Sequence, residues 1–134
     1  MNTLGLQFLN VFLIVFHTAI LLFNVFGWIW KKTRRWNLYL LLGTFFSWLI
    51  LGLWKGIGYC VVTDLHWQVR RALGERILDG SFLDYLMRGI AGDVPDPNLT
   101  RLVCGVTFAF VGMMSIGLNV RDAVRSHKLL AKSC

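Results

Sequence analysis

Three long runs of apolar residues dominate the chain, and polar or charged residues separate each run from the next. They cover about residues 4–30, 38–59 and 99–120. Each run has the roughly 20 residues that a helix needs to cross the hydrocarbon core of a bilayer, and a helix satisfies its own backbone polar groups there. The pattern therefore predicts an all-α membrane protein with three transmembrane helices, folded as a single membrane domain over residues 1–134.

The segment between the second and third runs, residues 61–92, follows a different pattern. It contains the stretch LHWQVRRALGERIL, in which apolar residues recur at helical spacing and most polar residues fall elsewhere. This arrangement predicts a short amphipathic helix on the outer side of the membrane. The apolar stripe of that helix consists of Leu65, Val69, Leu73 and Ile77.

A second short helix is predicted from the stretch SFLDYLMRG. Ser81 stands at a typical N-cap position, and Asp84 follows three residues later, as in a capping box. Asp84 and Arg88 are four residues apart, which favours an ion pair along the helix. About ten residues cannot span a bilayer, so this helix is expected to lie on the outer interface or to cap the bundle. Its apolar side would present Phe82, Tyr85, Leu86 and Ile90.

Basic residues gather beside the apolar runs in a way that predicts the orientation of the chain. Lysine and arginine are absent before residue 31, occur four times within residues 31–35, and occur four times after residue 120. By the positive-inside rule the N-terminus then lies outside and the C-terminus in the cytoplasm. The segment over about residues 60–98 carries four arginines and six acidic residues, a net charge of −2, and is placed on the outer side.

Composition supports a membrane protein and argues against a nucleic-acid partner. Hydrophobic residues make up 56% of the 134 residues, and the mean hydropathy is +0.59. A soluble domain would be closer to half apolar. The net charge of +7 comes from basic residues that flank apolar runs instead of forming one soluble face. Topology and contact with anionic lipid explain that placement better than nucleic acid does.

A stripe of polar side chains interrupts the first apolar run. Residues seven apart on a helix are about two turns apart and share a face. Lipid would leave such groups without partners, so the stripe is expected to face protein or a hydrated cavity. Hydrogen bonding between helices is the first interpretation, a role in binding a ligand, proton or haem is the second, and an oligomer contact is the third. The stripe consists of Gln7, Asn10, His17 and Asn24.

Small residues recur at close spacing in the second and third runs. This spacing lets helices approach closely, either within the monomer or in a dimer. The positions are Gly52 and Gly56 in the second run, and Gly105, Ala109 and Gly112 in the third.

Cys60, Asp64 and His66 are the one group with the residue types of a nucleophile, an acid and a base. Closeness in sequence is weak support for catalysis, because such groups usually meet through the fold. Cys60 could instead pair with Cys104 if the outer side is oxidising. The cysteines fit no zinc spacing, so no metal site is predicted.

The stretch CVVTDLHWQVRRALG, which begins at Cys60, resembles the signature of the DUF2784 family of small bacterial membrane proteins. That signature runs roughly CPLTPLExxLRxxxG. Further similarity lies in a His-x5-Phe-x3-Gly pattern in the first run, an F-x2-YL pattern in the outer segment and an asparagine late in the third run. The similar positions are His17, Phe23, Gly27, Cys60, Thr63, Leu65, Arg70, Gly74, Phe82, Tyr85, Leu86 and Asn119.

The sequence departs from the family pattern at three places. Val61 replaces the proline after the cysteine, His66 replaces the acid after the leucine, and Gly43 stands near a position where the family has a second histidine. The missing histidine weakens the case for a two-histidine haem or metal site. The resemblance implies a bacterial inner membrane and supports the architecture, but it implies no activity.

Three functions fit these patterns. The first is a non-enzymatic accessory or scaffolding subunit of a membrane complex, or a small homo-oligomer, whose partners are the lipid bilayer and other membrane subunits or itself. The second is a membrane oxidoreductase that binds a cofactor through His17. The third is a carrier of lipid or a small molecule, with the polar stripe lining a cavity. The first is preferred; no cofactor is predicted, and haem is a minor alternative.

Overall fold

The computed structural model of the chain describes residues 2–56, 58–93 and 96–133. Within that part of the chain every regular element is a helix. In chain order the elements are α1 (Thr3–Phe26), α2 (Arg34–Phe46), the short π-helix η1 (Ser47–Leu51), α3 (Gly52–Lys55), α4 (Val61–Ala72), α5 (Phe82–Ala91) and α6 (Pro97–Ser133).

Three helices are long and apolar enough to cross a membrane: α1, α6 and the continuous helix formed by α2, η1 and α3. This confirms the predicted helical fold and the number of candidate spans. The first helix ends at Phe26 and the second already begins at Arg34, because a tight turn connects them. The Thr33 hydroxyl fixes that turn by donating to the carbonyl of Gly27 at 2.7 Å. The third helix continues to Ser133, beyond the end of its apolar run.

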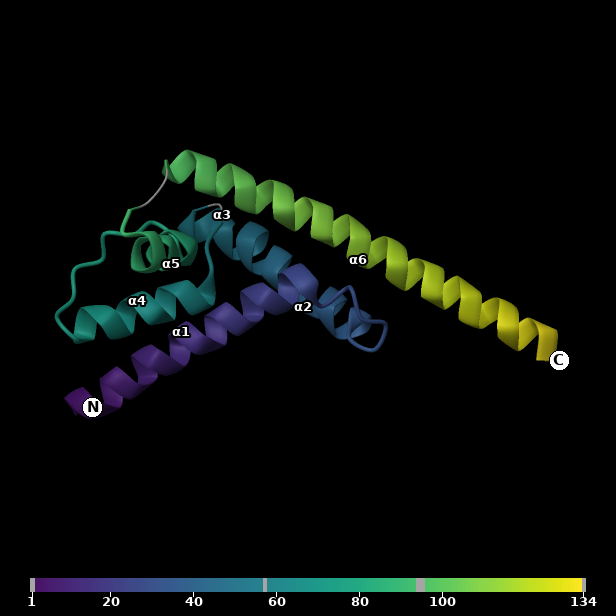
Figure 1. Ribbon diagram of the computed structural model, residues 1–134, viewed down its shortest axis with the longest axis horizontal. Helices are drawn as coiled ribbons and strands as arrows, with labels where there is room; N and C mark the ends of the chain where they lie inside the picture. The colour runs from purple at the N-terminus through teal and green to yellow at the C-terminus, as the bar shows by residue number, and fades with distance from the viewer. Residues whose placement is uncertain (1, 57, 94–95, 134) are drawn as a thin grey trace.

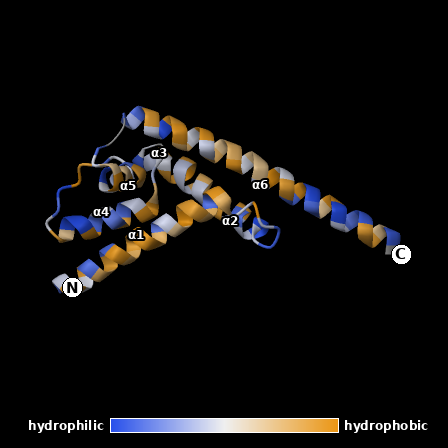
Figure 2. Ribbon diagram, in the orientation of Figure 1, coloured by the Kyte–Doolittle hydropathy of each residue, from blue (hydrophilic) through white to orange (hydrophobic). Residues whose placement is uncertain are grey.

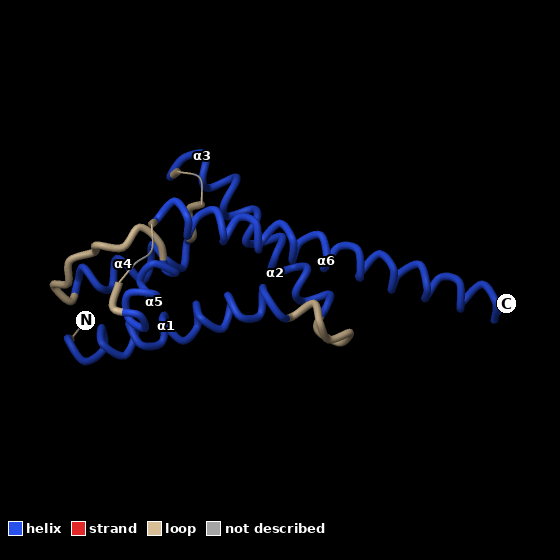
Figure 3. The backbone as a smooth tube through the Cα atoms, turned by 45° about the horizontal axis from the view of Figure 1, so that its top comes forward, coloured by secondary structure: helices blue, strands red, loops and turns tan. Residues whose placement is uncertain are grey.

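The helices form an open V that is filled at its wide end. Figure 1 shows α1 and α6 close together near the start of α2 and diverging toward the N-terminus, with α4 and α5 between them. The same order is seen in the rotated view of Figure 3, where a long connection joins α4 to α5. The C-terminal part of α6 projects past the other helices, and it is more hydrophilic than α1 (Figure 2). The filled end of the V brings the segment over residues 61–92 into contact with α1.

α4 lies alongside α1 and runs in the opposite direction (Figure 1). It starts beside the middle of α1, where the Cys60 sulfur is 3.7 Å from His17 Nε2. The chain folds back to reach that start, because the Ser47 hydroxyl donates to the carbonyl of Tyr59 at 3.1 Å. Ser47 precedes Lys55, the end of α3, by eight residues, which correspond to about 12 Å of helix. The start of α4 therefore lies about two helical turns back from the end of α3, beside the middle of α1.

The end of α4 differs from the predicted one. The sequence pattern predicts a helix over 65–78, but α4 ends at Ala72. The amide of Glu75 bonds to the carbonyl of Arg70, and the amide of Gly74 bonds to the carbonyl of Arg71, both at 3.0 Å. This pair of bonds is the Schellman arrangement, which needs a residue in the left-handed region, and Gly74 has φ of +82°. The glycine ends the helix before Ile77 can join it.

The buried face of α4 also differs from the predicted apolar stripe. Leu65 is 46% exposed, whereas His66 is fully buried and Trp67 and Val69 are nearly so. The face turned toward α1 is therefore built around a histidine. The predicted stripe is correct at Val69 and wrong at Leu65.

α5 begins as predicted, with the Ser81 hydroxyl accepting a hydrogen bond from the amide of Asp84 at 3.1 Å. The predicted ion pair between Asp84 and Arg88 is wrong. Arg88 Nε donates instead to Asp79 Oδ1 at 2.8 Å, while Asp84 is buried and its Oδ2 accepts a hydrogen bond from the Ser81 hydroxyl at 2.8 Å. Ile90 is 86% exposed and takes no part in the packed side of α5.

A buried polar network joins the three candidate spans. Asn37 in α2 is fully buried, and its Nδ2 donates to the carbonyls of Phe23 and Asn24 in α1 at 2.7 and 3.1 Å. Its Oδ1 accepts a hydrogen bond from the Ser115 hydroxyl of α6 at 2.9 Å. One side chain thus fixes all three helices to each other.

The small residues make fewer close contacts than the sequence predicts. Gly52 is buried, but Gly56 is an exposed residue that ends α3. A methyl group added at Gly105 or Gly112 would have no neighbour within 4 Å, and Ala109 is exposed. Close packing of these α6 residues within the monomer is therefore wrong, and this face of α6 is open.

Candidate functional site

Two histidines, a cysteine and two aromatic side chains meet where α1, α4 and α5 come together. We name this group the histidine cluster, and its members are His17, Cys60, His66, Phe82 and Tyr85. The two histidines are 5% and 0% exposed. All members except His66 belong to the positions that resemble DUF2784. The fold therefore gathers residues that are up to 68 positions apart in the sequence into one place.

The thiol of Cys60 faces the ring of His17. The sulfur lies 3.7 Å from Nε2, within reach of a hydrogen bond. Cys60 is also the N-cap residue of α4, and the start of a helix favours negative charge. The pair has the geometry of a nucleophile and a base.

His66 is held by an amide of α1. Its Nε2 lies 2.7 Å from Asn10 Oδ1, and because an amide oxygen only accepts, Nε2 is the donor. Nδ1 has no hydrogen-bond partner among the described residues. Protonating the ring would add a second buried N–H without an acceptor. Burial accordingly lowers the pKa of His66, as does the charge of Arg70, while Glu75 acts in the opposite direction.

Aromatic rings enclose both histidines. Phe82 stacks on His17 with a centroid distance of 4.0 Å and an interplanar angle of 16°. Tyr85 meets His66 edge-on at 5.4 Å and also lies under the guanidinium of Arg70 at 4.5 Å. Such contacts favour a fixed ring orientation and exclude water from the imidazoles.

Arg70 connects the cluster to the loop after α4. Its Nε donates to Glu75 Oε2 at 2.7 Å, and its Nη1 is 4.0 Å from Asp79 Oδ2. Asp79 is buried and also binds Arg88. Arg70 therefore has a structural role, holding the loop against α5.

The predicted group of Cys60, Asp64 and His66 is not assembled. Asp64 accepts a hydrogen bond from Gln68 at 2.9 Å, while Cys60 and His66 turn toward α1. Cys104 and Cys60 are both free thiols, so the alternative disulfide is also wrong. These three residues were grouped because they are close along the chain. In the structure their side chains face different neighbours.

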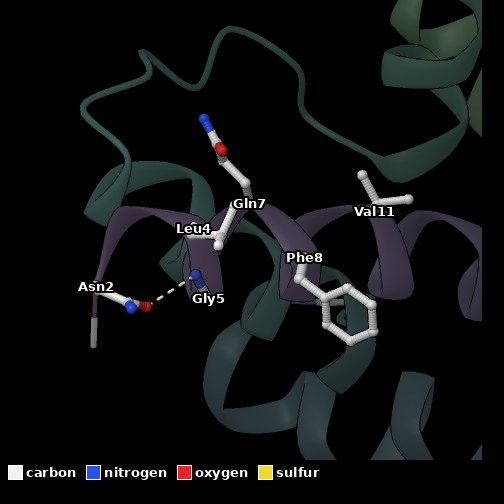
Figure 4. A pocket seen from close by; sticks show the side chains of 6 residues that line it. All are labelled: Asn2, Leu4, Gly5, Gln7, Phe8 and Val11. Atoms are coloured by element: carbon white, nitrogen blue, oxygen red, sulfur yellow. Dashed lines mark hydrogen bonds between the residues drawn. The ribbon is translucent and has the colours of Figure 1, made fainter.

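The polar stripe of α1 faces protein at three of its four positions. Asn10 and His17 contact α4, and Asn24 Nδ2 donates to Thr44 Oγ1 of α2 at 3.1 Å. Gln7 does not join them. Its side chain is exposed and stands off the first turns of α1, beside the shallow apolar surface shown in Figure 4. The stripe is used mainly to bind neighbouring helices.

Two buried polar residues were missed as a pair by the sequence patterns. Asn37 and Ser115 are both fully buried and bond to each other. Asn37 follows the basic residues of the first turn, so it reads as part of a polar loop. The sequence carries no separate signal for its burial, because the start of α2 at Arg34 is known only from the structure.

The histidine cluster contains two imidazoles and one thiol. Among the residues that the structure describes, no three His, Cys, Asp or Glu side chains lie close enough to hold a metal ion. Thr63 and Leu65 make no described polar contact with the cluster, and Thr63 is only half-buried.

Replacing Asn10 with leucine is expected to lower the free energy of unfolding by about 1 kcal/mol, because His66 Nε2 loses its acceptor in a buried site. Unfolding in mixed micelles, followed by circular dichroism, measures this effect. Gln7→Leu, an exposed position on the same helix, is the control and should leave stability nearly unchanged. Equal effects of the two substitutions would show that the Asn10–His66 bond does not contribute.

Stability is expected to fall as the pH drops below about 6.5. The pKa of His66 is lowered in the folded chain, so the unfolded state, with an ordinary value near 6.5, takes up the proton first. The contribution is fully present above the unfolded pKa and is lost on acidification. Chemical unfolding between pH 5 and 8 tests this, and His66→Gln should flatten the profile. An unchanged profile in His66→Gln would assign the pH dependence to other groups.

The fold and the site together define a class: a small helical protein with three helices that can cross a membrane and a packed histidine cluster where the first of them meets α4 and α5. Within that class, the chain belongs to the family described as Protein of Unknown function (DUF2784), which matches residues 7–120. No curated protein and no solved structure matches the chain. The match confirms the resemblance to this family that the sequence showed.

Proposed function

We propose that this protein is a non-enzymatic accessory or scaffolding subunit of the bacterial inner membrane, with its N-terminus outside and its C-terminus in the cytoplasm. The basic residues at 31–35 and beyond 120 support this orientation through the positive-inside rule. The proposed role is to pack against another membrane subunit or a second copy of this chain. In this role the histidine cluster holds α4 and α5 in place.

The observation that carries the proposal is the open face of α6. Gly105 and Gly112 would accept a methyl group without any contact inside the monomer. Ala109, on the same face, is exposed. Small residues at this spacing let a second helix approach closely in lipid, where van der Waals packing drives association. The polar side chains of Asn10, Asn24 and Asn37 are engaged inside the chain, which leaves packing as the main property of the outer surface.

Native mass spectrometry of the protein released from its membrane tests the role. The wild-type chain is expected to carry a second copy or another subunit, and Gly105→Leu combined with Gly112→Leu should remove that partner. Gly43→Leu is the matched control, because Gly43 in α2 also has no neighbour within 4 Å. A strict monomer with no co-purifying subunit would contradict the proposal, as would equal losses in the control.

The Cys60–His17 contact supports a second candidate function, a membrane oxidoreductase that works through this thiol and imidazole. Alkylation by N-ethylmaleimide tests whether the thiol is activated. Under native conditions Cys60 is expected to react at least tenfold faster than Cys104. His17→Leu should abolish this difference in rate. Equal rates for the two cysteines would remove the support for this function.

A further inference from the structure

A polar cavity of about 340 Å³ lies between the turn after α1, the start of α2 and the C-terminal half of α6. Basic side chains come from one wall and hydrogen-bonding groups from the other. The lining residues are Lys31, Lys32, Arg34, Arg35, Asn119, Asp122, Ala123 and Ser126. The four cations and one carboxylate give this small volume a net charge of +3.

Hydrogen bonds around Arg34 fix the walls of this cavity. The guanidinium donates from Nη1 to Asp122 Oδ2 at 2.8 Å and from Nε to the carbonyl of Trp28 at 3.0 Å. Asn119 Nδ2 in turn donates to the carbonyl of Arg34 at 3.2 Å. The Arg34 side chain is only 13% exposed. The cavity is thus a fixed feature of the fold, and Arg34 serves to build it.

Three of the four cations are left for a ligand. Asp122 is bound by Arg34, whereas Lys31, Lys32 and Arg35 are exposed. No ion pair joins these three to a carboxylate in the part of the chain that the structure describes. Three cationic donors close together favour an anion with several acceptor oxygens. A phosphate group is such an anion.

The cavity lies at the level where α1 ends and α2 begins. Trp30 and Trp36 flank it in sequence and are 61% and 69% exposed. Exposed tryptophans beside lysines and arginines mark the headgroup region of a bilayer. Basic pockets between helices on the cytoplasmic side are suited to lipid headgroups.

We propose that this cavity binds the phosphate of an anionic phospholipid headgroup in the inner leaflet. Lys31, Lys32 and Arg35 neutralise the phosphate, and Ser126 offers a hydroxyl donor from α6. The inference rests on the proposed membrane orientation and not on the proposed role as an accessory subunit. A bound headgroup would connect the turn between α1 and α2 to α6, and so stabilise the narrow end of the V.

The test uses the full chain in a neutral detergent, titrated with phosphatidylglycerol or phosphatidylcholine and read by native mass spectrometry. The wild type is expected to retain phosphatidylglycerol in preference to phosphatidylcholine. Substituting Lys31→Gln, Lys32→Gln and Arg35→Gln together should weaken phosphatidylglycerol binding at least tenfold, since each cation near an anionic surface contributes measurably. Lys31→Arg with Lys32→Arg keeps the charges and should retain binding, which also guards against a folding defect.

The matched control removes the same charge from α6 outside the cavity, with Arg121→Gln, Arg125→Gln and Lys128→Gln. It should lower binding less than threefold; an equal loss would assign the lipid to general surface charge and overturn the site. Inorganic phosphate at matched concentration should not displace the lipid. Displacement would show a site for soluble phosphate and overturn the lipid assignment. Loss of a partner subunit does not change the lipid binding measured here. A failure of the lipid proposal can therefore be distinguished from a failure of the proposed accessory role.

Discussion

Replacing Asn37 with leucine is expected to lower the free energy of unfolding by about 2 kcal/mol. The side chain is fully buried and bonds to α1 through Phe23 and Asn24 and to α6 through Ser115. Leucine has a similar size, so the loss comes from the hydrogen bonds and from the Ser115 hydroxyl that remains buried without its acceptor. Unfolding by increasing mole fraction of a denaturing detergent, monitored by tryptophan fluorescence, measures the change.

Two further substitutions separate the contributions to that loss. Ser115→Ala removes only the bond to α6 and should cost about 0.6 kcal/mol. Gln7→Leu changes an exposed polar residue of α1 and should cost nothing measurable. If Asn37→Leu were no more destabilising than Gln7→Leu, the network would not be what holds the three helices together.

The number and type of helices could be predicted from the sequence because lipid imposes a simple constraint. A run of about 20 apolar residues has one stable form in a bilayer, so hydropathy alone is sufficient. The ends of these helices could not be predicted from hydropathy. Thr33 and Gly27 close a turn that shortens the first helix, and Asn37, read as part of the polar loop, lies inside the second one. Hydrogen bonds determine where these helices end, and the hydropathy of the residues does not predict those bonds.

The segment between the second and third candidate spans shows where helical periodicity fails. The spacing of Leu65 and Val69 is correct for a helix, but the face that packs against α1 is chosen by His66. A fully buried histidine with an amide partner 56 residues away cannot be inferred from a local stripe of apolar residues. Gly74, in contrast, carries a local signal, because a glycine after a helix commonly ends it.

Several residues of the candidate site could be identified from the sequence one by one. The sequence did not predict that they lie together. His17 and Cys60 both stand out in the sequence, one as a polar residue in an apolar run and the other in the family signature. Their contact depends on α4 running antiparallel to α1 and starting level with the middle of that helix. That placement follows from the fold-back after α3, where Ser47 binds the carbonyl of Tyr59. Such tertiary placement has no counterpart in spacing or composition.

Replacing Gly27 with alanine is expected to destabilise the protein by about 2 kcal/mol, because overpacking a fixed contact typically costs 1–3 kcal/mol. A Cβ at this position would lie 2.5 Å from the carbonyl oxygen of Phe23 and 2.9 Å from Asn37 Nδ2. Neither neighbour can move easily, since one is backbone and the other is the buried centre of the network. The methyl group would therefore push α1 and α2 apart at the point where they are joined. Detergent unfolding measures the loss.

Gly43→Ala is the matched control for this substitution. Gly43 also lies in a candidate span, but an added methyl group there has no neighbour within 4 Å. Because alanine has the higher helix propensity, this change should be neutral or stabilise by up to about 1 kcal/mol. The double substitution Gly27→Ala with Asn37→Leu should cost less than the sum of the two single changes, since both break the same contact. Full additivity, or equal effects of Gly27→Ala and Gly43→Ala, would contradict a close approach of the first two spans at Gly27.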